Sequence, residues 1–98
     1  MDTDKQVVQE ADLALVAATQ QFLNASLVDR ADIRPSLEKA RQSWADARYR
    51  LLFPDSVTVQ ADLDSAKELR RRIGQAADKQ ALMQALLDLA GLLIKFAH

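Results

Sequence analysis

The chain has 98 residues, of which 49% are hydrophobic and 28% charged, with a net charge of −1 and no cysteine. This length fits one domain with a modest core, and this composition excludes a disordered chain, a disulfide framework and a global electrostatic attraction to nucleic acid or acidic membranes. The 17 alanines, with only two glycines and two prolines, favour helices. We therefore expect residues 1–98 to form a single all-helical domain.

Two segments, residues 4–28 and 34–53, have the apolar spacing of amphipathic helices. Their apolar residues recur at alternating intervals of three and four, which places them on one helix face. These residues are Val8, Ala11, Leu15, Ala18, Phe22 and Ala25 in the first segment and Leu37, Ala40, Trp44, Ala47 and Leu51 in the second. In both, large residues alternate with alanines, and two such faces can interdigitate with closely spaced axes. The pattern predicts that the two helices pack against each other along their alanines.

The connection between these two helices is predicted at residues 29–33. Pro35 then falls in the first turn of the second helix, where its missing N–H needs no partner. Asp32 or Arg34 lies near the helix cap. Because the connection is short, the two helices are expected to form an antiparallel hairpin.

The sequence FPDSV, at residues 53–57, interrupts the helical pattern. A residue that precedes proline is disfavoured in helical geometry, so the second helix should end at Phe53. Asp55 or Ser56 is then placed to cap a third helix over residues 57–73.

A fourth helix is predicted over residues 78–97. The apolar stripe of the third helix, continued past Gly74, falls mostly on the polar side of the last segment, which indicates a break between residues 74 and 78. Gly74 suits a helix C-terminus and Asp78 suits an N-cap. The expected fold is all-α, a small bundle of four helices whose first two form a hairpin.

The final stretch LMQALLDLAGLLIKFAH, residues 82–98, is apolar around most of the helix circumference. Its polar or small residues form one narrow stripe on the helix. Together with Gln80, one turn earlier, this stripe consists of Gln80, Gln84, Asp88, Gly91, Lys95 and His98. A membrane span is not expected, because it requires about 20 apolar residues and this segment contains Gln84, Asp88 and Lys95. The apolar arc is wider than a peripheral helix needs. Part of it is therefore expected to lie outside the core of the chain, at an interface.

The residues predicted to form this interface are Met83, Leu87, Leu92, Ile94 and Phe96. The expected partner is a second copy of the chain in a symmetric homodimer, or another protein. The sequence thus favours a small non-enzymatic protein–protein interaction or assembly module, of the adaptor, chaperone or inhibitor kind.

No constellation of catalytic residues is recognisable in the sequence. His98, the one histidine, is the last residue printed, where no surrounding structure orients an imidazole. Asp62, Asp64 and Glu68 lack the glycine-bearing turn and the number of oxygen ligands that a calcium loop needs. We expect no enzymatic activity, no cofactor and no metal. The acidic start MDTDKQ, unlike a signal peptide, favours a cytoplasmic protein.

Two basic clusters suggest an alternative function. Arg48, Tyr49 and Arg50 lie at the end of the second helix, and Lys67, Arg70, Arg71 and Arg72 at the end of the third. If these ends met, they would form a surface for phosphates, with Tyr49 as a stacking platform. Consecutive arginines, however, point about 100° apart around a helix, and basic residues also complement the dipole at a helix C-terminus. A small nucleic-acid-binding or regulatory domain is therefore only the second hypothesis.

Overall fold

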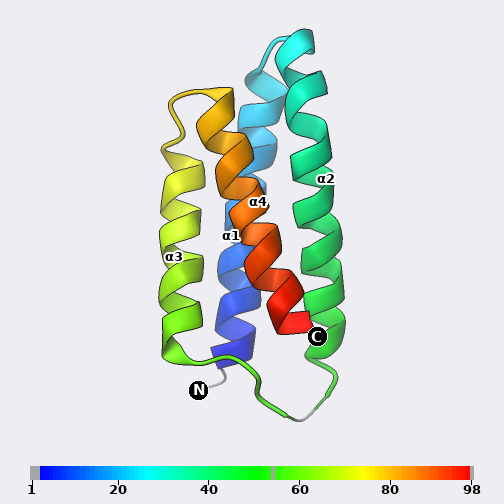
Figure 1. The fold of residues 1–98 in the computed structure, drawn as a ribbon, viewed down its shortest axis with the longest axis vertical. Helices are drawn as coiled ribbons and strands as arrows, with labels where there is room; N and C mark the ends of the chain where they lie inside the picture. The colour runs from blue at the N-terminus through cyan, green and yellow to red at the C-terminus, as the bar shows by residue number, and fades with distance from the viewer. Residues whose placement is uncertain (1–2, 54, 98) are drawn as a thin grey trace.

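A computed structural model describes residues 3–53 and 55–97 of the chain (Figure 1). Within these ranges the protein forms four helices and no strand, which confirms the predicted all-α bundle. The helices are α1 (Thr3–Asn24), α2 (Leu27–Arg50), α3 (Gln60–Gly74) and α4 (Lys79–Ala97). His98, for which no catalytic or metal-binding role is expected, lies outside the described residues.

The helices alternate in direction along the long axis of the bundle (Figure 1). The helices α1 and α2 form the predicted antiparallel hairpin, and α3 and α4 form a second one. The most extensive contacts, however, join α2 to α4 and α1 to α3, and each of these pairs runs in the same direction. The segment 51–59 crosses one end of the bundle to connect α2 with α3, so that α3 comes to lie beside α1.

The apolar face of α4 fills much of the core. Its buried residues Leu82, Leu86, Leu89, Leu93 and Phe96 recur at intervals of four and three, opposite the polar stripe of this helix. The residues of the other helices that pack in the same cluster are Val8, Ala11, Ala14, Leu15, Ala18, Ile33, Leu37, Ala40, Ala47, Leu69 and Ile73. α4 is therefore a central helix that is covered from two sides, by α2 and by α3.

Alanines allow the helices to approach closely. Ala11, Ala18, Ala40 and Ala47 are fully buried, and Ala25 packs partly buried against the core. They are buried, but the predicted packing of α1 against α2 along them is not the main helix contact. Since the most extensive contacts lie between the parallel pairs, the alanine faces do not serve the α1–α2 contact alone.

The α1–α2 connection is shorter than predicted and lies at a different place. α1 ends at Asn24 and α2 begins at Leu27, so the predicted loop 29–33 is helical. The reason is a serine cap: Ser26 Oγ accepts a hydrogen bond from Asp29 N–H at 3.1 Å. Neither Asp32 nor Arg34 caps the helix, and Pro35 lies inside α2 rather than in its first turn.

Pro35 weakens α2, because it cannot donate to the Ala31 carbonyl one turn earlier. Both residues are exposed, so water can reach that carbonyl. Pro35→Ala restores the missing donor, and we expect it to raise the free energy of unfolding by about 1–3 kcal/mol. Urea denaturation of the two proteins measures this difference. An unchanged or lower midpoint would contradict the position of Pro35 within the helix.

A buried carboxylate holds the α2–α3 connection. Asp4, in the first turn of α1, accepts hydrogen bonds from Val57 N–H, from Thr58 N–H at 3.0 Å, and from the hydroxyls of Ser56 and Thr58. These bonds fix residues 56–58 in a non-helical conformation, which is why α3 begins at Gln60 and not at residue 57. Asp62 then accepts from Val59 N–H at 2.9 Å. The predicted capping by Asp55 or Ser56 is therefore wrong.

These contacts also set the ionisation of Asp4. Burial by itself would raise the pKa of Asp4, but the hydrogen bonds from Thr58, Val57 and Ser56 outweigh burial and hold this pKa below its ordinary value of 3.8. A lowered pKa in the folded state stabilises the protein above pH 3.8, and this contribution is lost as the pH falls through the lower, folded-state pKa.

Asp4→Asn should accordingly lower the free energy of unfolding at pH 7 by about 1.5–3 kcal/mol, the range for hydrogen bonds to a charged group. The difference from the wild type should shrink when the pH is lowered below 4, because the wild-type carboxylate then also becomes neutral. Denaturant unfolding at a series of pH values tests both statements. A difference independent of pH would show that the charge of Asp4 contributes nothing.

The α3–α4 connection lies between Gly74 and Lys79, where the sequence predicts the break. α3 ends at Gly74, and Asp78 Oδ1 accepts from Ala81 N–H at 2.8 Å as the N-cap of α4. Lys79 Nζ lies 2.5 Å from Asp32 Oδ2 and 3.2 Å from Asp29 Oδ1, which ties the start of α4 to the start of α2. Hydrogen bonds to Asp32 and Asp29 raise the pKa of Lys79. The two carboxylates also offset the unfavourable position of a cation at a helix N-terminus.

Candidate interaction surfaces

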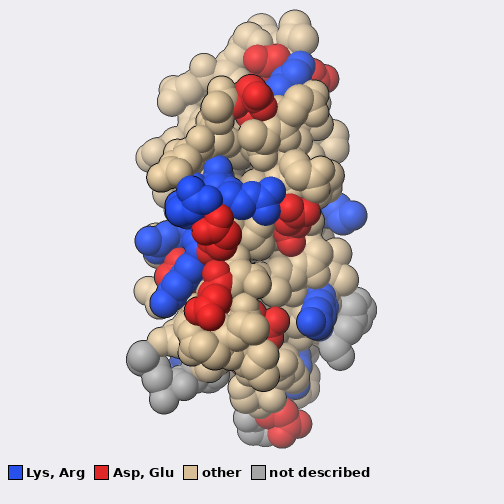
Figure 2. Space-filling view, turned by 60° about the vertical axis from the view of Figure 1, so that its left-hand side comes forward, with Lys and Arg blue, Asp and Glu red and all other residues tan. Residues whose placement is uncertain are grey.

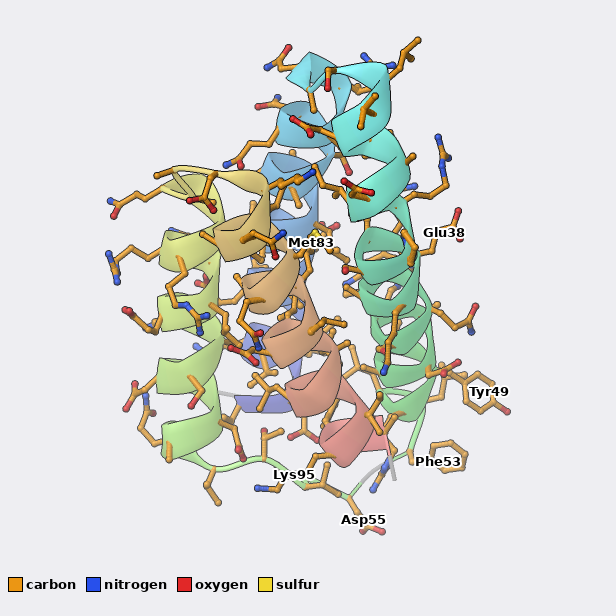
Figure 3. The ribbon with its side chains drawn as sticks, turned by 45° about the horizontal axis from the view of Figure 1, so that its top comes forward. Glu38, Tyr49, Phe53, Asp55, Met83 and Lys95 are labelled. Carbon is orange, nitrogen blue, oxygen red and sulfur yellow. The ribbon has the colours of Figure 1, made fainter. Side chains whose placement is uncertain are left out.

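The five residues predicted for the interface of the last helix do not share one surface. Leu87 and Ile94 are exposed, seven residues apart on one face of α4. Met83 is half-buried between α4 and α2 (Figure 3). Leu92 is half-buried on the side of α3, where it packs against the cluster of Val7, Leu63 and Ala66. Phe96 is buried in the core, because it continues the inward-facing series from Leu82.

An apolar patch lies at the end of the bundle where α2 finishes. We call Tyr49, Leu52, Phe53 and Ile94 the α2–α4 patch; their exposed fractions are 65%, 76%, 50% and 37%. The rings of Tyr49 and Phe53 meet edge to face with centroids 5.8 Å apart, and both point away from the bundle (Figure 3). Tyr49 and Ile94 line one shallow hollow of about 300 Å³ together with Ser43, Asp46 and Ala97. The sequence pattern indicated Ile94 as an interface residue but not Leu52 or Phe53, although these two lie at the predicted end of the second helix.

The two basic clusters of the sequence lie at opposite ends of the bundle. Arg48, Tyr49 and Arg50 belong to the end of α2 that adjoins the crossing segment, whereas Arg70, Arg71 and Arg72 lie near the other end, in the last turns of α3 (Figure 1). Among the described residues, α2 and α3 make no direct contact. Arg48 and Arg50 therefore do not form one phosphate-binding surface with Lys67 and the arginines of α3.

The arginines of α3 are paired with carboxylates on three helices. Arg70 Nη1 lies 2.9 Å from Glu10, Arg71 Nη2 lies 2.5 Å from Glu68, and Arg72 Nη1 lies 3.0 Å from Asp88. The hydrogen bond from Arg71 lowers the pKa of Glu68, and that same hydrogen bond raises the pKa of Arg71. Figure 2 shows basic and acidic side chains interleaved on this face. Arg70 and Arg72 thus connect α3 to α1 and α4, whereas the Arg71 pair lies within α3.

A second row of arginines lies along α2. Arg30, Arg34, Arg41 and Arg48 follow one another at intervals of four, seven and seven, which places them on one side of the helix. Arg41 Nη2 donates to Thr19 Oγ1 of α1 at 2.9 Å, and the Arg34 guanidinium lies 5.1 Å from the ring centroid of Phe22. We call these residues the α2 arginine row. The spacing is present in the sequence, but only clusters of neighbouring basic residues were used to predict a binding surface.

A groove runs beside this row, between α1 and α2. It has a volume of about 490 Å³ and is lined by Asp12, Leu15, Val16, Thr19, Gln20, Arg41, Trp44 and Ala45. Trp44 Nε1 donates to the Val8 carbonyl at 3.2 Å, which fixes the indole as the floor between the two helices. Val16 is about half exposed at the rim. The groove is thus mainly apolar, with one carboxylate and one guanidinium at its edge.

The carboxylates of Asp62, Asp64 and Glu68 each have a partner within α3 or at its N-cap. Asp62 accepts from Val59 N–H, Asp64 from Gln60 Nε2, and Glu68 pairs with Arg71. Within residues 3–53 and 55–97, no group of three or more Asp, Glu, His or Cys side chains is arranged to hold a metal ion.

α4 is long and apolar enough to cross a membrane by length and composition, criteria that the core helix of a soluble bundle also meets. In this fold its inward face packs against α2 and α3. Comparisons of the chain with protein-family models, curated proteins and solved structures find no match.

If the α3 arginines act only in ion pairs, changing Arg70, Arg71 and Arg72 together to Gln leaves the helical fold intact. We expect only a small loss in the free energy of unfolding, since exposed pairs contribute little each. Circular dichroism and urea denaturation measure both quantities. A filter-binding assay with labelled DNA and RNA at near-physiological salt completes the experiment. Submicromolar binding that the triple variant abolishes would instead establish α3 as a nucleic-acid surface.

Proposed function

We propose that the protein is a non-enzymatic protein–protein interaction module that assembles with a second copy of itself through the α2–α4 patch. The observation that supports this proposal is the exposure of two aromatic and two aliphatic side chains at one end of the bundle. Burial of such side chains in a partner contributes most of the binding energy at typical interfaces, where aromatic residues are enriched. Leu87 extends the patch along α4.

The charges around the patch favour a symmetric partner. Asp46 lines the same hollow as Ile94, and the Arg50 guanidinium lies 5.5 Å from the ring centroid of Phe53. In a twofold dimer, a residue pair formed in one direction is repeated in the other. Asp46 of each copy can therefore face Arg50 of the other, around a centre of apolar contacts.

Gly91 favours a close approach on the same face of α4. It lies between Leu87 and Ile94, is exposed, and a methyl group added to it would meet no atom within 4 Å. A helix of the second copy can thus come nearer to α4 here than a larger side chain would permit.

The test is the mass of the protein in solution. Wild-type protein should behave as a dimer in light scattering and analytical ultracentrifugation. Phe53→Glu and Ile94→Glu should each weaken the dimer about 30-fold or more, because loss of an interface anchor costs about 2 kcal/mol or more. Leu13→Glu is the matched control, since it places the same charge on an exposed leucine of α1 that lies outside the patch.

A wild type that remains monomeric at its highest soluble concentration would exclude the homodimer. Equal weakening by Leu13→Glu would show that the added charge acts without regard to position. Circular dichroism of each variant separates a loss of assembly from a loss of fold.

A further inference from the structure

The ion pairs of the molecule divide its arginines into two groups. The five ion pairs found within the described residues include Arg70, Arg71, Arg72 and Lys79, but no arginine of the α2 arginine row. The row instead contacts neutral groups. Arg30 donates to the carbonyls of Phe22 and Leu23, Arg41 donates to Thr19, and the guanidinium of Arg48 lies 4.8 Å from the Trp44 ring centroid. The positive charge of this row is therefore not balanced by a carboxylate in direct contact.

The row borders the groove between α1 and α2, whose floor is the Trp44 side chain. Arg41 belongs to both the row and the groove lining, and Arg48 stacks on Trp44, which lines the groove as well. The volume of about 490 Å³ falls in the range of sites that hold ligands or partner side chains. An occupant thus meets an apolar floor with the Arg41 guanidinium at its edge, and the other arginines of the row lie beyond the groove lining along α2.

We infer that this groove binds an acidic amphipathic helix of a partner protein. Arg34, Arg41 and Arg48 are seven residues apart, and seven residues span about 10.5 Å of an α-helix. A helix that lies along α2 with an acidic residue every seven positions presents its carboxylates at this same interval. Its apolar residues at the positions between them are then directed towards Val16 and Trp44.

The same spacing argues against nucleic acid as the occupant. Phosphates follow one another at about 3.4 Å per strand along duplex DNA, so a row with 10.5 Å intervals leaves most of them without a partner.

The experiment uses Trp44, the single tryptophan of the chain, as a reporter inside the groove. The probe is a synthetic helical peptide with leucines at heptad positions a and d and a glutamate at one flanking position of every heptad. A peptide of the same composition in scrambled order is its control. Binding of the ordered peptide should shift the emission of Trp44 and raise the anisotropy of a label on the peptide, and the scrambled peptide should do neither.

Two triple variants with equal loss of charge decide the role of the row. Arg34, Arg41 and Arg48 changed to Gln should weaken peptide binding at least tenfold, whereas Arg70, Arg71 and Arg72 changed to Gln should leave it unchanged. Val16→Glu should also weaken it, because it places a charge at the apolar rim. Arg30 is kept in all variants, since it donates to the final carbonyls of α1.

The proposal is overturned if the ordered peptide does not bind, or if the two triple variants weaken binding equally. It is also overturned if labelled single-stranded or duplex DNA binds more tightly than the peptide and loses affinity only in the α2 variant. Light scattering on the same variants keeps this result separate from self-association: changes in the α2 arginine row should leave the dimer intact, because the row lies outside the α2–α4 patch.

Discussion

The fold depends on the burial of one helix that is apolar around most of its surface. Five large side chains of α4 face inward at intervals of four and three, and none of them is more than 3% exposed. A helix with so wide an apolar face needs neighbours on more than one side. α2 and α3 supply them, and α1 closes the bundle opposite α4. The amphipathic face of α3, formed by Leu63, Ala66, Leu69 and Ile73, is therefore as necessary as that of α2.

This arrangement determines the path of the chain between α2 and α3. Because α3 lies beside α1 and not beside α2, the chain between α2 and α3 crosses the end of the bundle, and residues 55–59 of this segment are not helical. Backbone N–H groups in such a segment need acceptors. Asp4 provides one carboxylate for two N–H groups and two hydroxyls, so the first turn of α1 determines where α3 can begin.

The arginines on the surface fall into two groups with different contacts. On α3, each of three consecutive arginines reaches a carboxylate, two of them on neighbouring helices. On α2, the arginines lie over aromatic rings or bind carbonyl and hydroxyl oxygens, and within the described residues no ion pair joins this row to a carboxylate. The α2–α4 patch, by contrast, consists of exposed aromatic and aliphatic side chains beside Asp46.

The sequence by itself determined the number and type of helices, the break at Gly74–Asp78 and the alanines of the core, because these follow from periodicity and from local capping. It did not place the α1–α2 turn: Pro35 favoured a later start, but the Ser26 cap begins α2 at Leu27 and leaves the proline inside the helix. Which helices pair, and where α3 begins, were decided only by tertiary structure, since Asp4 and Thr58 are 54 residues apart in the chain. The candidate surfaces likewise required the fold. Phe96 and Ile94 are two residues apart with similar hydrophobicity, and only the positions of α2 and α3 decide that Phe96 is buried and Ile94 exposed.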